Sequence, residues 1–311
     1  MQSLSLLTDD FEELQDASTN WDQQYFKLSP GRFEGGIELM QVGSRQIFRE
    51  RWGKKIRYQG TAPPRSFGFA LPLDQPGTAN WVGIPACTDT VILQSPGQEA
   101  ELVSSDYWDA LVLAVPEEEV RTITSVLSGK DDNSRNFYGV LTLKRDVADK
   151  LRRTSLDFLR MSKLACSGQE IQVSLWSEQF VKMFLWELVS VREGSSSVVG
   201  PSKHGNIVRQ ATELALSDPT CRIGLTELCA HARVSLRSLH YAFQDVTGMS
   251  PATWLRKIRL NEAHKTLLRS SPGEVLVKQV AIDHGFFHLG HFGRQYRSLF
   301  GCSPSHTLYS A

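Results

Sequence analysis

Two stretches near the end of the chain close on the same pattern: LTELCAHARVSLRSLHYAFQDVTGMSP at residues 225–251 and VKQVAIDHGFFHLGHFGRQYRSLFGCSP at residues 277–304. In each, an aromatic residue is followed by four residues, a glycine, one further residue and Ser-Pro. The aromatic residue is Phe243 in the first stretch and Tyr296 in the second. A chance match at such spacing is improbable, so the sequence predicts a structural unit that has been duplicated.

Each stretch has the pattern of a short helix, a tight turn and a second helix. Ser235 suits the N-cap of a helix that buries Leu239 and Phe243, and Gly285 supplies the turn in the second stretch. Two short helices joined by a tight turn form a helix-turn-helix, whose second helix enters the DNA major groove. We expect one such motif at about residues 225–244 and another at about residues 277–298.

Residues 251–269 are predicted to form a helix that connects the two motifs. Ser250 and Pro251 have the N-cap and first-turn chemistry of a helix start. The buried side of this helix is expected to consist of Trp254, Leu255, Ile258, Ala263 and Leu267. Recognition helices fixed ~34 Å apart on one connector meet successive major grooves on the same face of DNA. The alternative is an all-helical packing module with no role in DNA binding.

The formal net charge of zero hides an asymmetry between the two parts of the chain. Residues 200–311 contain 13 Lys+Arg and 7 Asp+Glu, a balance of +6, which leaves 21 against 27, or −6, for residues 1–199. All eight histidines also lie after residue 200. A basic C-terminal part indicates an anionic partner, and nucleic acid is the first candidate.

Three histidines in the second motif raise the question of a metal site. His288 and His291 are predicted to project from the start of the recognition helix, whereas His284 precedes the turn. A metal needs three or four converging ligands, so zinc is disfavoured, although a zinc-dependent protein is kept as a third hypothesis. The same positions present base-reading side chains on a recognition helix, and Arg294 lies one turn further on.

The N-terminal part has a different rhythm. Short strands separated by Gly, Pro, Asn and Asp run from about residue 33 to about 115, which predicts an antiparallel β-barrel or sandwich, and helices are expected from about 116 to 193. A Ser- and Gly-rich stretch at residues 194–205 is the predicted linker. The sequence thus predicts a sensor and dimerisation domain at residues 1–193 and a DNA-binding domain at residues 206–311.

One predicted helix of the first domain carries an apolar stripe at four-residue spacing: Trp176, Phe180, Phe184 and Leu188. Such a stripe must be buried against something. Two partners are open, the domain's own barrel or a second copy of the chain in a homodimer.

The first domain lacks the residues of a metal-dependent or nucleophilic enzyme. No histidine occurs before His204, and no P-loop or other nucleotide-binding pattern is present. Six of the seven tryptophans lie in this domain, so a small-molecule pocket with aromatic walls is possible, and Arg49, Arg51 and Trp52 on one predicted strand are candidates for its mouth. An odd number of cysteines, no signal sequence and no long apolar run predict a cytoplasmic protein.

The last third of the chain resembles the DNA-binding domain of the AraC/XylS family of transcription regulators. The match extends over about residues 206–306 and includes Leu228, Ser235, Leu239, Phe243, Gly248, Ser250, Pro251, Leu255, Arg259, Leu260, Ala263, Leu267, Leu268, Val280, Ala281, Gly285, Phe286, Phe292, Arg294, Tyr296, Phe300, Gly301, Ser303 and Pro304. The resemblance implies an α+β protein with a cupin-like sensor barrel, double-stranded DNA and RNA polymerase as partners, and an effector-responsive activator that forms a homodimer.

The resemblance also implies which residues face DNA. They are Arg237, His240 and Tyr241 in the first motif, and His288, Leu289, Gly290, His291 and Arg294 in the second. Arg233 departs from the family, which has Gly at this turn. Because a side chain in the left-handed region costs ~1 kcal/mol, a turn of different geometry is an open alternative here. His240 and Tyr241 replace longer Gln or Arg side chains, so no base preference can be carried over.

Residues 21–50 together with residues 285–308 resemble a subgroup that contains regulators of ethanolamine-utilisation operons. That resemblance implies ethanolamine and adenosylcobalamin as effectors. The second hypothesis is a small-molecule-binding protein or enzyme whose helical C-terminal domain only mediates protein contacts. Binding to DNA with a steep salt dependence distinguishes the two.

Overall fold

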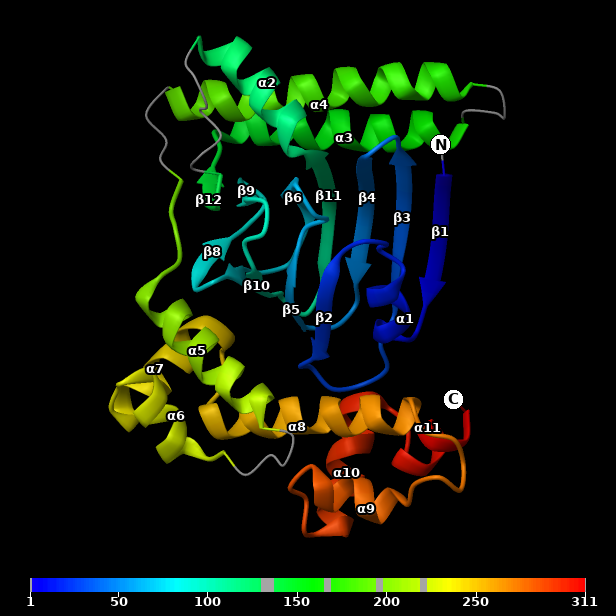
Figure 1. Ribbon diagram of the computed structural model, residues 1–311, viewed down its shortest axis with the longest axis vertical. Helices are drawn as coiled ribbons and strands as arrows, with labels where there is room; N and C mark the ends of the chain where they lie inside the picture. Colours follow the sequence, from blue (N-terminus) through cyan, green and yellow to red (C-terminus); the bar gives the residue numbers. More distant parts are fainter. Residues whose placement is uncertain (1, 130–136, 165–168, 194–197, 219–222, 311) are drawn as a thin grey trace.

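The computed structural model describes residues 2–129, 137–164, 169–193, 198–218 and 223–310. It has three layers: a group of helices, two β-sheets, and the C-terminal helices packed beneath the sheets (Figure 1). Cys166, Cys221 and residues 194–197 of the expected linker lie outside the described residues. Within the described ranges, no helix combines the length and the apolar character that crossing a membrane requires.

The larger sheet contains seven antiparallel strands in the order β1-β3-β4-β11-β6-β9-β12. In strand β4 (Arg45–Trp52), successive side chains point to opposite faces of the sheet. Phe48, Glu50 and Trp52 therefore lie on one face, and Ile47, Arg49 and Arg51 lie on the other. The strands are β1 (Gln2–Thr8), β3 (Gly35–Val42), β4 (Arg45–Trp52), β11 (Trp108–Pro116), β6 (Ser66–Asp74), β9 (Thr90–Gln94) and β12 (Gly139–Thr142).

The smaller sheet has five antiparallel strands in the order β2-β5-β10-β7-β8 and faces the larger one (Figure 1). Its strands are β2 (Asp22–Lys27), β5 (Ile56–Thr61), β10 (Ala100–Val103), β7 (Ala79–Trp81) and β8 (Ile84–Ala86). The antiparallel β class of the N-terminal part is confirmed. Its extent differs from the prediction, because β1 and β2 precede residue 33 and β12 follows residue 116 as an edge strand on β9.

Three helices cover the outer face of the larger sheet: α2 (Glu117–Ser128), α3 (Arg145–Leu164) and α4 (Glu170–Glu193). The apolar stripe of α4 is buried there. Phe180, Phe184 and Leu188 are each no more than 4% exposed, and Phe180 stacks on Phe158 with ring centroids 4.7 Å apart. The use of Phe180, Phe184 and Leu188 in a homodimer was therefore a wrong prediction, and Trp176 is a partly buried member of the same core.

The C-terminal layer is entirely helical. It consists of α5 (Lys203–Ser217), α6 (Leu225–Ala232), α7 (Leu236–Thr247), α8 (Pro251–Leu268), α9 (Val277–Asp283), α10 (Leu289–Phe300) and α11 (Pro304–Ser310). The two helix pairs α6–α7 and α9–α10 lie at opposite ends of α8 (Figure 1). Each pair is followed by a left-handed glycine cap, Gly248 with φ 70° and Gly301 with φ 84°, and then by Ser-Pro.

The duplication extends to the backbone hydrogen bonds of the turns. The amide of Val234 donates to the carbonyl of Cys229 over 3.0 Å, and the amide of Phe286 donates to the carbonyl of Ala281 over 2.8 Å. Both are bonds from a residue just past a helix end back to the residue five earlier, which close a helix C-terminus. The two turns are therefore built in the same way.

The sheets and the C-terminal helices share their cores. Phe26 of β2 belongs to the core of the first helix pair, where the cations of Arg57 and Lys265 lie 5.1 and 4.1 Å from its ring centroid. Near the second pair, Phe11 of α1 (Phe11–Asp16) stacks on His264, which in turn stacks on Phe300 at 4.1 Å. Burial lowers the pKa of His264 to about 3, so this ring is neutral and packs as an aromatic residue.

Candidate nucleic-acid interface and ligand cavity

The first predicted reading surface lies at the start of α7. The hydroxyl of Ser235 accepts the amide of Ser238 over 3.1 Å and begins the helix, while Leu239 is fully buried. Arg237, His240 and Tyr241 are exposed on the opposite side. The guanidinium Nη2 of Arg237 donates to the hydroxyl of Tyr241 over 3.2 Å. These donors are thus ordered on a rigid helix and are not occupied by an acidic partner.

Arg233 takes the left-handed conformation at the turn before α7, with φ 53° and ψ 45°. The turn therefore keeps the geometry that a glycine would adopt freely, and it does so at a cost of about 1 kcal/mol. The side chain of Arg233 is exposed, so packing does not explain why an arginine stands at this position. The departure from the family pattern changes the residue and leaves the turn in place.

The second predicted surface lies at the start of α10. His288 occupies the N-cap, and Leu289, Gly290, His291 and Arg294 are all exposed in the first turns. The Nη2 atom of Arg294 lies 3.3 Å from Nδ1 of His291. A Cβ atom built at Gly290 would meet no atom within 4 Å, so packing inside the protein does not require a glycine there.

The histidines do not form a metal site. Nε2 of His284 lies 2.9 Å from the hydroxyl of Thr266, on the other side of the turn from His288 and His291, and burial lowers the pKa of His284. The rings of His288 and His291 are 6.2 Å apart. Across the part of the chain that the structure describes, no group of three His, Cys, Asp or Glu side chains is arranged to hold a metal ion.

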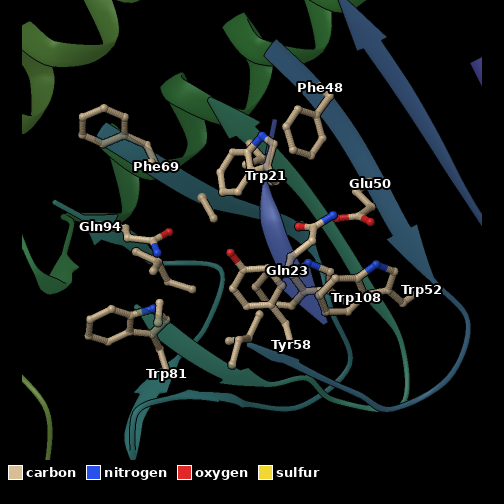
Figure 2. A pocket seen from close by; sticks show the side chains of 16 residues that line it. Trp21, Gln23, Phe48, Glu50, Trp52, Tyr58, Phe69, Trp81, Gln94 and Trp108 are labelled. Atoms are coloured by element: carbon tan, nitrogen blue, oxygen red, sulfur yellow. The ribbon is translucent and has the colours of Figure 1, made fainter. Parts of the chain in front are cut away.

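A partly open cavity lies between the two sheets (Figure 2), and the space in it that the centre of a water-sized sphere can occupy is about 60 Å³. By that measure the cavity holds a few water molecules or a small organic ligand. Seven of its sixteen lining residues are aromatic, and the polar side chains are few. The lining residues come from both sheets: Trp21, Gln23, Phe48, Glu50, Trp52, Tyr58, Gly68, Phe69, Ala70, Trp81, Ile92, Gln94, Ala100, Leu102, Trp108 and Val112.

The three residues predicted at the mouth of a pocket separate on the structure. Trp52 lines the cavity, but Arg49 and Arg51 point away from it. Nη2 of Arg49 pairs with the carboxylate of Asp109 over 2.5 Å, and Nη2 of Arg51 lies 3.5 Å from Glu38. Grouping the arginines with Trp52 was an error, because adjacent side chains on a strand point to opposite faces.

The prediction missed Glu50, which lies on the cavity side of the same strand. The signal was present in the alternation, since Phe48, Glu50 and Trp52 share one face and two of them are large aromatic residues. Burial raises the pKa of the Glu50 carboxyl to about 7, and the Tyr25 hydroxyl donates to it over 2.6 Å. Tyr58 has a raised pKa for the same reason and keeps its proton.

Comparison with known proteins agrees with the arrangement of the C-terminal helices. A helix-turn-helix domain family matches residues 228–309. The "Probable thc operon regulatory protein" of Rhodococcus erythropolis is 35% identical over 102 residues, which are 33% of this chain and 31% of that protein. The "XylDLEGF operon transcriptional activator" of Pseudomonas putida is 24% identical over 284 residues, covering 89% of this chain and 85% of that protein.

Two solved structures are also similar to parts of this chain. A probable AraC family transcriptional regulator from Rhodopseudomonas palustris CGA009 is 38% identical, covers 33% of this chain and 94% of that chain, and has a TM-score of 0.31. ToxT from Vibrio cholerae is 18% identical, covers 85% of this chain and 98% of that chain, and has a TM-score of 0.33.

Proposed function

The chain carries a C-terminal helix-turn-helix domain of the AraC/XylS family of transcription regulators, and from that premise we propose how it reads DNA and responds to an effector. The helices α7 and α10 enter two successive major grooves. Arg237, His240 and Tyr241 face one groove, and His288, Leu289, Gly290, His291 and Arg294 face the other. The observation that carries this proposal is the pair of matching helix-turn-helix units, each with exposed donors, at the two ends of α8.

The cavity between the sheets is the proposed effector site. It is a partly open, aromatic-lined space in the domain that packs directly on α8 through β2, so an occupant is placed to bias how the two parts are held together. A ligand acts on such an equilibrium only through a difference in affinity between the two arrangements. We propose that the response is activation of transcription, with RNA polymerase as a partner.

The finer proposals about assembly and effector rest on particular surfaces. The proposed homodimer would use the apolar side chains that α4 leaves exposed. These are Ile171, Leu175 and Trp186, whose exposed fractions are 79%, 51% and 53%. For the ethanolamine-regulator subgroup, the support is that residues 21–50, which carry the resemblance, supply Trp21, Gln23, Phe48 and Glu50 to the cavity. None of the four proteins named above is described as a regulator of ethanolamine utilisation, so ethanolamine with adenosylcobalamin stays a proposal.

Salt dependence tests the DNA-binding function against a helical module that only contacts proteins. We expect the full chain to bind random-sequence duplex DNA with an affinity that falls about thirtyfold or more for a fourfold rise in salt, as when three or more phosphates are neutralised. The double variant Arg237→Ala with Arg294→Ala should weaken binding at every salt concentration. Arg153→Ala, an exposed arginine on α3, is the matched control and should bind as the wild type does. Absence of measurable DNA binding would contradict the function.

A further inference from the structure

We infer that the cavity binds a small organic cation, an ammonium compound, with the Glu50 carboxylate as its counter-ion and the surrounding aromatic rings as its cage. The inference rests on the proposed function only in taking the cavity as the ligand site. It goes further by assigning, from the residues of the cavity wall alone, the charge of the ligand and the carboxylate that pairs with it. Four features of the cavity wall support it. They are the single negative charge of the wall, the lack of a cationic partner for Glu50 among the described residues, the orientation of the Gln94 amide, and the aromatic rings.

The only ionisable charge among the lining residues of the cavity is negative. Glu50 is the sole carboxyl among the lining residues, and no Lys, Arg or His is among them. The arginines of the same strand, Arg49 and Arg51, lie on the other face of the sheet and are paired with Asp109 and Glu38. An anionic ligand would therefore meet no counter-charge in the cavity, whereas a cation meets a carboxylate.

Glu50 is buried without a cationic partner. It is 4% exposed, and the ion pairs of the described residues do not include it. Its hydrogen bond comes from the Tyr25 hydroxyl on β2. A buried carboxylate of this kind is costly unless a charge compensates it, and a bound ammonium group supplies that charge.

One of the two amides of the wall, that of Gln94, presents its oxygen to the cavity. Nε2 of Gln94 donates to the carbonyls of Gly60 and Gln98, both over 2.8 Å, which fixes its orientation and leaves Oε1 facing Gly68 on the cavity wall. Nε2 of Gln23 donates to the carbonyl of Gln15 over 2.7 Å. Gln94 therefore has both of its N–H donors engaged elsewhere, and its oxygen suits the N–H donors of an ammonium ligand.

Aromatic rings surround the space between these polar groups (Figure 2). Trp52 and Trp108 stack with centroids 5.8 Å apart beside Glu50, while Trp81 and Gln94 lie on the opposite side with Tyr58 between. Nε1 of Trp21 donates to Gln46 over 2.8 Å, which holds the indole in the wall. A desolvated cation is attracted to the faces of such rings, and tryptophan attracts it most strongly.

Binding should be linked to pH through Glu50. The titratable groups that face it are Tyr25 from β2 and Tyr58 from β5, and both tyrosines keep their protons because burial raises the pKa of each. The neighbouring strands β3 and β11 place Ile37 and Ala110 opposite it. Since the pKa of Glu50 in the empty cavity is about 7, the ionised form that pairs with a cation grows as pH rises through 7.

Calorimetry on the full chain without DNA tests the inference. The probes are choline against its uncharged isostere 3,3-dimethylbutan-1-ol, and butylammonium against 1-butanol. We expect at least one cation to bind more tightly than its neutral isostere by about tenfold or more. For choline, which does not titrate, the affinity should rise about tenfold from about pH 6 to about pH 8. Glu50→Gln should remove both the preference and the pH dependence, and Glu34→Gln, which changes an exposed carboxylate outside the cavity, should leave them unchanged.

The possible outcomes separate the inference from the proposed function. If the neutral isosteres bind as tightly as the cations or more tightly, the cation is overturned as the ligand class. The same holds if none of the four probes binds. Preference for the cation that persists in Glu50→Gln would overturn the role of Glu50. The isostere comparison on the wild type stands even if Glu50→Gln fails to fold. Because no DNA is present, loss of DNA binding in a separate assay affects the proposed function alone.

Discussion

Gly205→Ala is expected to separate the C-terminal helices from the β-sheets. Gly205 lies in the first turn of α5, where a Cβ atom would come within 1.9 Å of the carbonyl oxygen of Val82 and 2.8 Å of the amide nitrogen of Gly83. Val82 and Gly83 form the turn between β7 and β8 with positive φ values of 44° and 76°, and the amide of Ser202 donates to the Val82 carbonyl over 3.1 Å. A contact between backbones at this distance cannot accommodate a side chain.

The sign of the effect is diagnostic. Alanine is a better helix former than glycine by about 1 kcal/mol, so the substitution would stabilise α5 if the contact were absent. We expect it instead to weaken the packing of the two parts by about 3 kcal/mol, since neither backbone can yield. Small-angle scattering should show a larger radius of gyration, and calorimetry should resolve separate unfolding of the sheets and the helices.

Gly200→Ala is the matched control for this experiment. Gly200 precedes α5 by a few residues, and a Cβ atom there would meet nothing within 4 Å. It should retain the radius of gyration and the unfolding profile of the wild type. If Gly205→Ala behaves in the same way as Gly200→Ala, the close contact of α5 with the β7–β8 turn does not exist in solution.

Asn261→Ala is expected to have an effect of similar size at another contact between sheets and helices. Asn261 is fully buried on α8, and its Oδ1 accepts the amide of Lys27 over 2.8 Å while its Nδ2 donates to the carbonyl of Lys27 over 3.0 Å. Lys27 ends β2, an edge strand of the smaller sheet. The asparagine side chain therefore satisfies the two backbone groups that a further strand would have paired.

Removing that side chain leaves both backbone groups of Lys27 buried without partners. Each such group costs about 1–3 kcal/mol, so the free energy of unfolding should fall by about 4 kcal/mol. Denaturant titration followed by tryptophan fluorescence measures this. Arg256→Ala, an exposed position on the same helix, is the control and should stay within about 0.5 kcal/mol of the wild type. A loss for Asn261→Ala no larger than that of Arg256→Ala would mean that β2 and α8 are not joined by these bonds.

The part of the fold that could be predicted from the sequence depends on local chemistry. The glycine caps and Ser-Pro helix starts of the repeat act within a few residues, so their positions in the sequence were enough to indicate two similar helix pairs. The left-handed geometry of the turn at Arg233 was not predicted, because a side chain there costs about 1 kcal/mol, yet Arg233 adopts it. Edge strands such as β1 and β2 were missed because weak alternation near polar residues does not distinguish a strand from a loop.

The features that could not be predicted are contacts between distant parts of the chain. The periodicity of α4 indicated that Phe180 and Phe184 are buried, but periodicity does not name the partner, which is the larger sheet and not a second copy. Asn261 and Lys27 are 234 residues apart, and nothing in either stretch marks the pairing. The cavity likewise depends on two sheets facing each other. Alternation along the strand places Glu50 on the same face as Phe48 and Trp52, but it does not show that this face lines a cavity.

Selection of duplex DNA from a random pool by the full chain, repeated with Arg237→Ala and with Arg294→Ala, tests the central claim most directly. The proposed function predicts that the wild type enriches two short elements about one helical turn apart. Each variant should relax a different element, with a discrimination loss of about 1–3 kcal/mol at the bases it reads. Arg153→Ala should give the wild-type elements. No enrichment, or loss of the same element in both variants, would contradict two separate reading helices.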